Sequence, residues 1–417
     1  MEKVQHQEPI RDASKLSISK QGILGLQHTF TMFGATVLVP ILTGLDISVA
    51  LFMSGICTLI CHLITKYKVP VYLGSSFAFI PPTLAAAAYA TANLGASNGL
   101  AYAQGGMVVA GLLYLIVSIL IFVFGVDKVV KFFPPVVTGP MILVIGINLA
   151  PTAISMASGN WMLAIIGFIV VIAVSIYAKG FLQIVPVIIG LIVGYIFAIF
   201  TGNVDFTPVK EAAIFGIPKF TVAKFDFNII MMVAPVAIAT IIEHIGDIVA
   251  IGSTVEKDFL EEPGLHRTMF ADGFCTSLSA MFGGPANTTY SENTGVLALT
   301  KVWDPKIMRI AAVFAICLGG IPKLAAIIQT IPTALVGGIS IILFGMIAGT
   351  GIRSIVENKI DYTQSKNLII TAAILVLALG GASIPITKDF SLSGMALAAI
   401  VGIILNLVLK SPEEKAK

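Results

Sequence analysis

The sequence predicts an all-α membrane protein with about fourteen transmembrane helices, arranged as two inverted repeats of seven. The first observation is composition: 57% of the 417 residues are hydrophobic and 11% are charged, against ~45–50% and ~25% in a soluble domain. The chain has too few polar residues to cover the surface of a water-soluble globule. Lipid must therefore be the solvent for most of it. A net charge of +3 argues against nucleic acid as a partner.

Apolar runs long enough to cross a bilayer account for each predicted span, since a spanning helix needs roughly 20 apolar residues. These runs lie at residues 22–43, 46–65, 70–90, 100–125, 132–150, 160–178, 181–201, 228–253, 268–283, 285–302, 307–329, 333–352, 367–384 and 390–409.

The distribution of basic residues tests this division independently. If the N-terminus is cytoplasmic, most of the 25 basic residues fall in inner segments, and the outer segments hold only Lys210, Lys219, Lys224 and Lys388. A miscounted span would assign every later loop to the opposite side of the membrane and remove this asymmetry. We therefore expect a multi-pass protein of the cell inner (plasma) membrane with both termini cytoplasmic.

The longest connection, residues 202–227, separates two sets of seven spans, and a repeat with an odd number of crossings must insert its second copy upside down. The third span of each half is interrupted by small and polar residues, at 72–77 and 283–293. We expect spans 3 and 10 to contain short extended segments that lead into half-helices, whose N-terminal amides point at a ligand. The alternative is a pair of ordinary kinked helices.

Four acidic residues fall within predicted spans: Glu243, Asp247, Asp272 and Glu292. A carboxylate at mid-membrane costs at least about 2.5–3.5 kcal/mol, so each is a candidate functional residue. Glu243 and Asp247 are four residues apart and share a helix face, where two carboxylates are expected to hold a proton or a cation between them. Asp272 lies beside Gly273, so a tight helix contact is an equal alternative for it.

Glu243 and Glu292 come from opposite halves, and two half-helices add backbone amides, so the site offers both acceptors and donors. A flat heterocycle with N–H and C=O groups, such as a pyrimidine dione, complements such a site. Phe77 and Tyr290 are placed to stack on it. Inorganic anions fit less well, because neither half-helix contains an arginine to offset the acids.

Three stretches carry a family resemblance: Gln27-His28, residues 72–79, and residues 292–301. The last matches every defined position of [Q/E/P]-N-x-G-x(4)-T-[R/K/G], the signature of the nucleobase–ascorbate transporter family, which the whole chain resembles. Glutamate at the first position, preceded by Asn-Thr-Thr-Tyr, is similar to the bacterial uracil permease branch.

The resemblance implies a homodimer of proton symporters that work by an elevator-like motion, without a cofactor or resident metal. It also implies a core domain that slides against a gate domain. The implied segments are a cytoplasmic tail (1–20), core (21–125), gate (126–201), external linker (202–227), core (228–329), gate (330–410) and a second tail (411–417).

By matching position, the resemblance implies that Glu243 and Glu292 hold the base, while the backbone amides of Phe77 and Ser291 donate to it. The surrounding shell is implied to contain Ala35, Ser76 and Tyr290, with support from Gln27, His28, His244, Thr289 and Asn293. Coupling is assigned to Glu243, Asp247 and Glu292.

Asp247 departs from the uracil branch, in which a histidine occupies this position, so sodium is an alternative coupling ion. A purine, xanthine or urate carrier is a second alternative. An intramembrane enzyme is a remote third, since the sequence has no convincing nucleophile–base pair.

Overall fold

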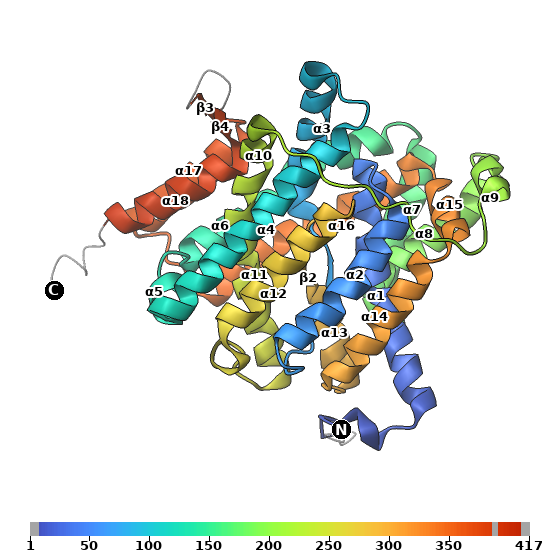
Figure 1. Ribbon diagram of the computed structural model, residues 1–417, viewed down its shortest axis with the longest axis horizontal. Helices are drawn as coiled ribbons and strands as arrows, with labels where there is room; N and C mark the ends of the chain where they lie inside the picture. Colours follow the sequence, from blue (N-terminus) through green and yellow to red (C-terminus); the bar gives the residue numbers. More distant parts are fainter. Residues whose placement is uncertain (1–7, 386–390, 410–417) are drawn as a thin grey trace.

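The structure is a computed structural model that describes residues 8–385 and 391–409 (Figure 1). The first seven residues of the predicted N-terminal tail, residue 410 and the predicted tail 411–417 lie outside the described residues. Helices dominate the described chain, as predicted. In the first half they are α1 (Ile18–Thr43), α2 (Ile47–Ile64), α3 (Ile80–Leu94), α4 (Gly99–Phe124), α5 (Val126–Val130), α6 (Pro135–Ala157), α7 (Trp161–Tyr177), α8 (Pro186–Phe200) and α9 (Thr207–Glu211).

The second half contains helices over each of the remaining predicted runs. They are α10 (Phe227–Val233), α11 (Ala237–Val255), α12 (Leu265–Met281), α13 (Ser291–Thr300), α14 (Pro305–Gly319), α15 (Pro322–Gln329), α16 (Thr333–Glu357), α17 (Ser365–Leu379) and α18 (Gly394–Val408). A hairpin of β3 (Ser383–Pro385) and β4 (Ser391–Ser393) precedes α18.

Among the described helices, six are long and apolar enough to cross a membrane, or seven if α14 and α15 form one broken span. Four more, α7, α8, α17 and α18, are apolar but shorter. The count of fourteen spans therefore stays a prediction. The run 307–329 is not one straight helix: α14 and α15 are bent by 79° at Gly319-Gly320-Ile321-Pro322, where two glycines and a proline interrupt the helix.

Both predicted interruptions are extended segments followed by half-helices. β1 (Leu73–Ser75) leads through the 3₁₀ turn Phe77–Phe79 into α3, and β2 (Asn287–Thr289) leads into α13. The two strands pair antiparallel, with Gly74 opposite Thr288. Pairing is continued by the Ser76 N–H to the Ala286 carbonyl (2.9 Å) and the Tyr290 N–H to the Tyr72 carbonyl (3.0 Å). All three residues of each strand are buried, so protein and not lipid surrounds the pair.

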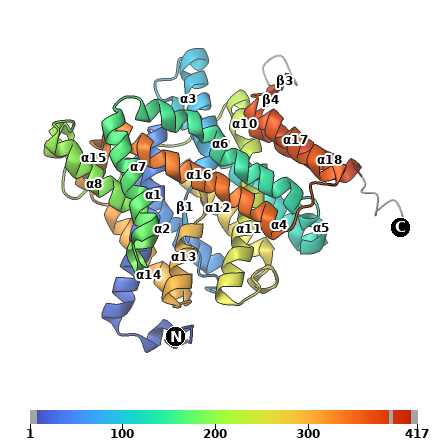
Figure 2. The same ribbon diagram turned by 180° about the vertical axis from the view of Figure 1, so that it is seen from behind.

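The helices pack in two groups. In the first, α4 packs on α12, while α14 packs on both α1 and α2; in the second, α16 packs on α6 and α7, and α17 packs on α6 and α18. Figures 1 and 2 place α17 and α18 at the opposite edge of the molecule from α9 and α15. Glycines permit the closest approach, as at Gly273 of α12, which lies against Tyr114 and Gly111 of α4.

The segment before α1 fastens the ends of α11 and α13. Ile10 forms a parallel bridge with Val302, just after α13, through the Ile10 N–H to the Lys301 carbonyl (2.8 Å) and the Trp303 N–H to the Ile10 carbonyl (2.8 Å). Arg11 pairs with Glu256 after α11 at 3.1 Å. The helices that carry Glu243 and Glu292 are thus tied together at one end by a third piece of chain.

Candidate functional site

The structure brings the acids of the two halves together. Glu243 and Asp247 lie on α11, which packs on α13, and Glu292 lies in the first turn of α13. The three carboxylates therefore lie on two neighbouring helices that contact each other. All three side chains are half-buried, whereas the intervening Ile245 is buried. One face of α11 therefore presents acids toward the start of α13.

Helix N-termini supply the donors of the site. Because β1 and β2 run antiparallel, α3 and α13 leave the strand pair at opposite ends, with their N-termini turned toward it. The first amides of a helix have no intrahelical acceptor and carry partial positive charge. The amides of Phe77 and Ser291 lie at the starts of these two helical segments. Glu292 occupies the first turn of α13, where that partial charge favours a carboxylate.

Tyr290 is buried and braced from several sides. Its hydroxyl donates to the Ser75 carbonyl (3.1 Å) and lies 3.2 Å from Thr36 Oγ1, and its ring stacks on Tyr72 with centroids 6.5 Å apart. The ring also covers Gly74. Tyr290 therefore holds β1 in place in addition to any contact with a ligand.

Phe77 is the aromatic residue that meets the second group of helices. Its ring contacts Phe344 of α16 edge to face, with centroids 6.0 Å apart. Ala35 and Tyr290 belong to the same apolar cluster. Phe344 was missed by the sequence reasoning, because a phenylalanine in an apolar helix carries no signal that distinguishes a site wall from a lipid contact.

Ser76 and the α1 residues add polar groups. The Ser76 side chain is buried, and its Oγ has no hydrogen-bond partner among the described residues, so it is available to a ligand. Asn293 Nδ2 donates to the His28 carbonyl and lies 3.1 Å from His28 Nδ1, which ties α13 to α1. Gln27 lies next to this tie, and its Oε1 is also without a partner in the described chain.

His244 and Asp272 form a pair that the sequence did not predict. His244 follows Glu243 but turns away from the carboxylate face, and its Nδ1 lies 2.9 Å from Asp272 Oδ2. Thr289, another predicted supporting residue, places its Oγ1 3.4 Å from the same nitrogen. Asp272 is thus both at a tight helix contact and paired, but it does not belong to the acidic face formed by Glu243, Asp247 and Glu292.

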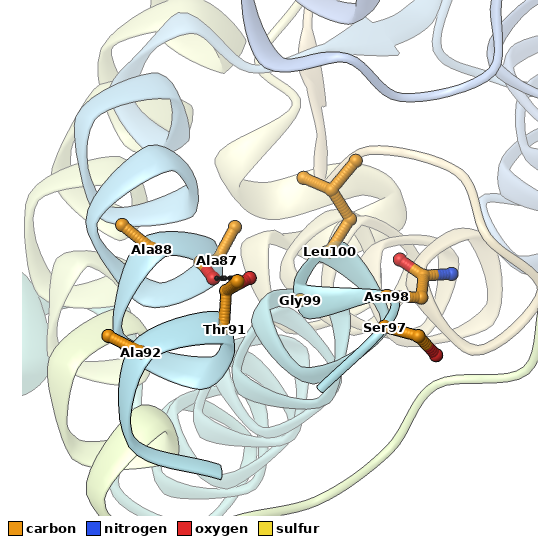
Figure 3. Close-up of a pocket in the computed structure, with 8 residues that line it drawn as sticks. All are labelled: Ala87, Ala88, Thr91, Ala92, Ser97, Asn98, Gly99 and Leu100. Atoms are coloured by element: carbon orange, nitrogen blue, oxygen red, sulfur yellow. Dashed lines mark hydrogen bonds between the residues drawn. The ribbon is translucent and has the colours of Figure 1, made fainter. Parts of the chain in front are cut away.

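An open pocket of about 590 Å³ lies elsewhere, between α3 and the start of α4 (Figure 3). Three alanines of α3 line it, together with Thr91, Ser97, Asn98 and the first residues of α4. The Thr91 hydroxyl donates back to the Ala87 carbonyl (3.0 Å), so one of its few polar groups is already used. It contains no acid and none of the predicted site residues, so we do not assign the binding site to it. The described residues contain no group of three or more His, Cys, Asp or Glu side chains arranged to hold a metal ion.

Comparison with known proteins identifies the family of the chain. A family model described as a permease family matches residues 19–387. The chain belongs to this family. The resemblance to nucleobase–ascorbate transporters is therefore confirmed, and the permease is a multi-pass membrane transporter and not an enzyme.

Similar proteins cover nearly the whole permease. A uracil permease of Bacillus caldolyticus is 43% identical over 94% of this chain and 93% of its own, and that of Bacillus subtilis is 44% identical over 94% and 92%. The transmembrane domain of the cyanobacterial bicarbonate transporter BicA has a similar fold, with a TM-score of 0.70 and 17% identity over 96% of this chain and all of that chain. The likeness to BicA concerns the fold alone.

Proposed function

We propose that this permease imports uracil across the cytoplasmic membrane by symport with a cation, a proton in the first instance. The observation that carries the proposal is the acidic face of α11 opposite the start of α13, flanked by two helix N-termini. Relatives that are uracil permeases, more than 40% identical over almost the full length, support the same substrate.

Uracil has the complementary groups. Its two ring N–H groups would donate to Glu243 and Glu292, and its carbonyl oxygens would accept from the amides of Phe77 and Ser291. Charge-assisted hydrogen bonds to carboxylates are stronger than neutral ones, which favours a ligand that offers N–H groups. The Phe77 ring would form one wall, with Ala35, Ser76 and Tyr290 around it.

Charge explains why a cation should accompany the substrate. Glu243, Asp247 and Glu292 are three acids on two contacting helices, and like charges in such a place favour a bound proton or cation. Uracil is neutral, so uracil alone does not offset their charge. A proton shared within the Glu243–Asp247 pair would lower the cost of moving the loaded site. Asp247, with its hard carboxylate oxygens, also makes sodium the specific alternative.

The two groups of helices provide a basis for motion. We assign residues 21–125 and 228–329 to a moving core and residues 126–201 and 330–410 to a gate, and we propose that the protein is a homodimer. The carboxylates and both half-helices belong to the core, and Phe344 of α16 belongs to the gate, so the Phe77–Phe344 contact lies between the two units. An elevator-like slide would replace this contact by another.

The test is uptake of radiolabelled uracil into proteoliposomes of the full-length protein. Uptake should rise when a proton gradient is directed into the proteoliposomes. It should fall strongly in Glu292→Gln, because the glutamine amide N–H groups cannot accept a hydrogen bond from a substrate N–H. Glu211→Gln, on exposed α9, is the matched control and should retain uptake. Uptake that ignores the pH gradient but follows sodium would overturn proton coupling. Uptake of radiolabelled xanthine that excess uracil fails to displace would favour a purine carrier.

A further inference from the structure

Residues 10–16, which precede α1, form a strap over the ends of three helices. Its backbone pairs with Val302, just after α13. The Ala13 N–H donates to Asp304 Oδ2 (2.7 Å), the side chain that caps α14. The third helix is α11, which Arg11 of the strap contacts. Since α11 and α13 carry the acids of the candidate site, the strap joins the far ends of both helices.

Arg11 makes three contacts from this strap. Its Nη1 donates to the Val255 carbonyl at 3.0 Å, and its Nη2 donates to a Glu256 carboxylate oxygen at 3.1 Å. The guanidinium also lies over the Trp303 ring, 4.8 Å from the centroid. The last carbonyls of a helix have no intrahelical donor and carry partial negative charge. A guanidinium is therefore a favourable partner for Val255, the last residue of α11.

Trp303 is itself held to α13. Its indole N–H donates to the Leu297 carbonyl (3.1 Å) in the last turn of that helix. Its backbone N–H donates to the Ile10 carbonyl of the strap (2.8 Å). A continuous chain of contacts thus runs from the end of α11 through Arg11 and Trp303 to α13.

A small apolar cluster keeps the strap in place. Its buried members come from the strap, α1, the segment after α13, and α14, and each is 8% exposed or less: Ala13, Leu24, Val302 and Ile307. Ile10 and Leu16 pack against this cluster. Because apolar burial holds the strap independently of its charged side chain, loss of Arg11 should leave the strap attached and remove only the link to α11.

We propose that Arg11 is a positioning residue, which holds α11 against α13 and thereby sets the spacing between Glu243 on one helix and Glu292 on the other. A helix rises about 1.5 Å per residue, so Arg11 acts about 18 Å from Glu243 along α11. A tilt at the end of either helix changes the distance between the two carboxylates. The inference rests on the proposed function, because it takes these two acids as ligands of uracil.

The position of the strap predicts which kinetic constant it affects. The helices α11, α13 and α14 all belong to the proposed core, so the strap moves together with the site. A loosened link should therefore weaken the grip on the substrate and leave the motion of core against gate unchanged.

The experiment measures uracil affinity, the maximal rate of uptake and the melting temperature of the full-length protein. Arg11→Ala should weaken uracil affinity by about threefold to tenfold, while the maximal rate per folded molecule stays close to that of the wild type. Arg11→Lys should have an intermediate affinity. An ammonium group is a single point charge and cannot donate to the Val255 carbonyl and to Glu256 in a fork while it covers Trp303.

Two control variants identify the source of the effect. Glu256→Gln removes only an ion pair whose side chains are 42% and 70% exposed, so it should retain affinity. Arg353→Ala removes an exposed arginine of α16 and should also match the wild type. A loss in either control equal to that in Arg11→Ala would overturn the proposal, as would wild-type affinity in Arg11→Ala. A lower melting temperature and rate with unchanged affinity would show a purely structural role and would overturn it as well.

A distance measurement tests the positioning without any substrate. Val249 of α11 and Leu299 of α13 are exposed, so nitroxide labels in Val249→Cys/Leu299→Cys report the distance between the two helices. Cys317→Ser removes the exposed native cysteine, and the other cysteines are buried. Arg11→Ala should broaden the distance distribution measured by double electron–electron resonance, and an unchanged distribution would contradict the proposal. If the wild-type protein does not bind uracil, the proposed function fails, whereas this distance still decides whether Arg11 positions the helices.

Discussion

Gly74 allows the most direct test of the strand pair at the centre of the candidate site. A Cβ atom at this position would lie 2.7 Å from Tyr290 Oη and closer still to two carbons of the ring, well inside the 3.4 Å at which ordinary contact begins. The ring cannot move aside freely, because its hydroxyl is bonded to Ser75 and lies against Thr36, with Tyr72 stacked on it. Overpacking of this kind costs about 1–3 kcal/mol, and a braced ring places Gly74→Ala in the upper part of that range.

The matched control is Gly22→Ala on α1, where an added Cβ meets nothing within 4 Å. Alanine is favoured over glycine in a helix by about 0.5–1 kcal/mol, so this variant should be neutral or slightly stabilising. Thermal unfolding in detergent and uracil uptake are measured for both. We expect Gly74→Ala to lose several degrees of melting temperature and most uptake. If it matched Gly22→Ala in both assays, the Tyr290 ring would not lie over β1 as described.

Two further predictions concern the Phe77–Phe344 contact and the loops. Phe344→Leu keeps most of the apolar volume but removes an edge-to-face contact with Phe77 worth about 0.5–1.5 kcal/mol. Uptake should therefore fall while the melting temperature changes little, and wild-type uptake in Phe344→Leu would contradict this role. Phe344→Ala should lose about 3–5 kcal/mol of stability. Hydrogen bonding by Lys68 lowers the pKa of the Glu262 carboxyl below its ordinary 4.5. The pair therefore stabilises the fold fully at a pH above 4.5, and this stabilisation is lost as the pH falls through the lower pKa of the folded state. The small difference in melting temperature between wild type and Glu262→Gln should therefore vanish once the pH lies below the folded-state pKa, and a difference that ignores pH would refute the pairing.

The sequence predicted the helices and both half-helices well, because these depend on local composition. Runs of apolar residues determine where helices form in lipid, and glycine, proline and serine at residues 72–82 and 283–293 mark where backbone must leave the helix. The bend between α14 and α15 had the same kind of signal in residues 319–322, although the apolar run around it was read as one span.

Contacts across helices could not be predicted in the same way. His244 and Asp272 are 28 residues apart on different helices, and their meeting depends on how α11 and α12 are rotated against each other. The contact of Phe344 with Phe77 depends similarly on packing between two groups of helices. Glu243 and Glu292 were predicted together only because the two halves share a pattern of interruptions and a resemblance to a transporter family.

The strand pair explains why the two halves must fold together. Each strand has one edge occupied by its partner, so its other edge would leave polar backbone groups unpaired in the interior of a membrane protein. Thr58 of α2 accepts a hydrogen bond from the Leu73 N–H at 3.0 Å, and Thr276 of α12 accepts one from the Asn287 N–H at 3.2 Å. Each threonine hydroxyl also donates to the carbonyl of the same strand residue.

The positions of these two threonines follow the repeat. Thr58 lies in the second span of the first half and Thr276 in the second span of the other, and each comes directly after a cysteine. Those cysteines meet reciprocally: Cys57 Sγ contacts the Cys275 carbonyl and Cys275 Sγ contacts the Cys57 carbonyl. Such a reciprocal contact is what a two-fold relation between inverted repeats requires at its axis. Neither half alone can satisfy its own strand, because each depends on the other for pairing, so the candidate binding site beside the two half-helices exists only once both repeats have folded.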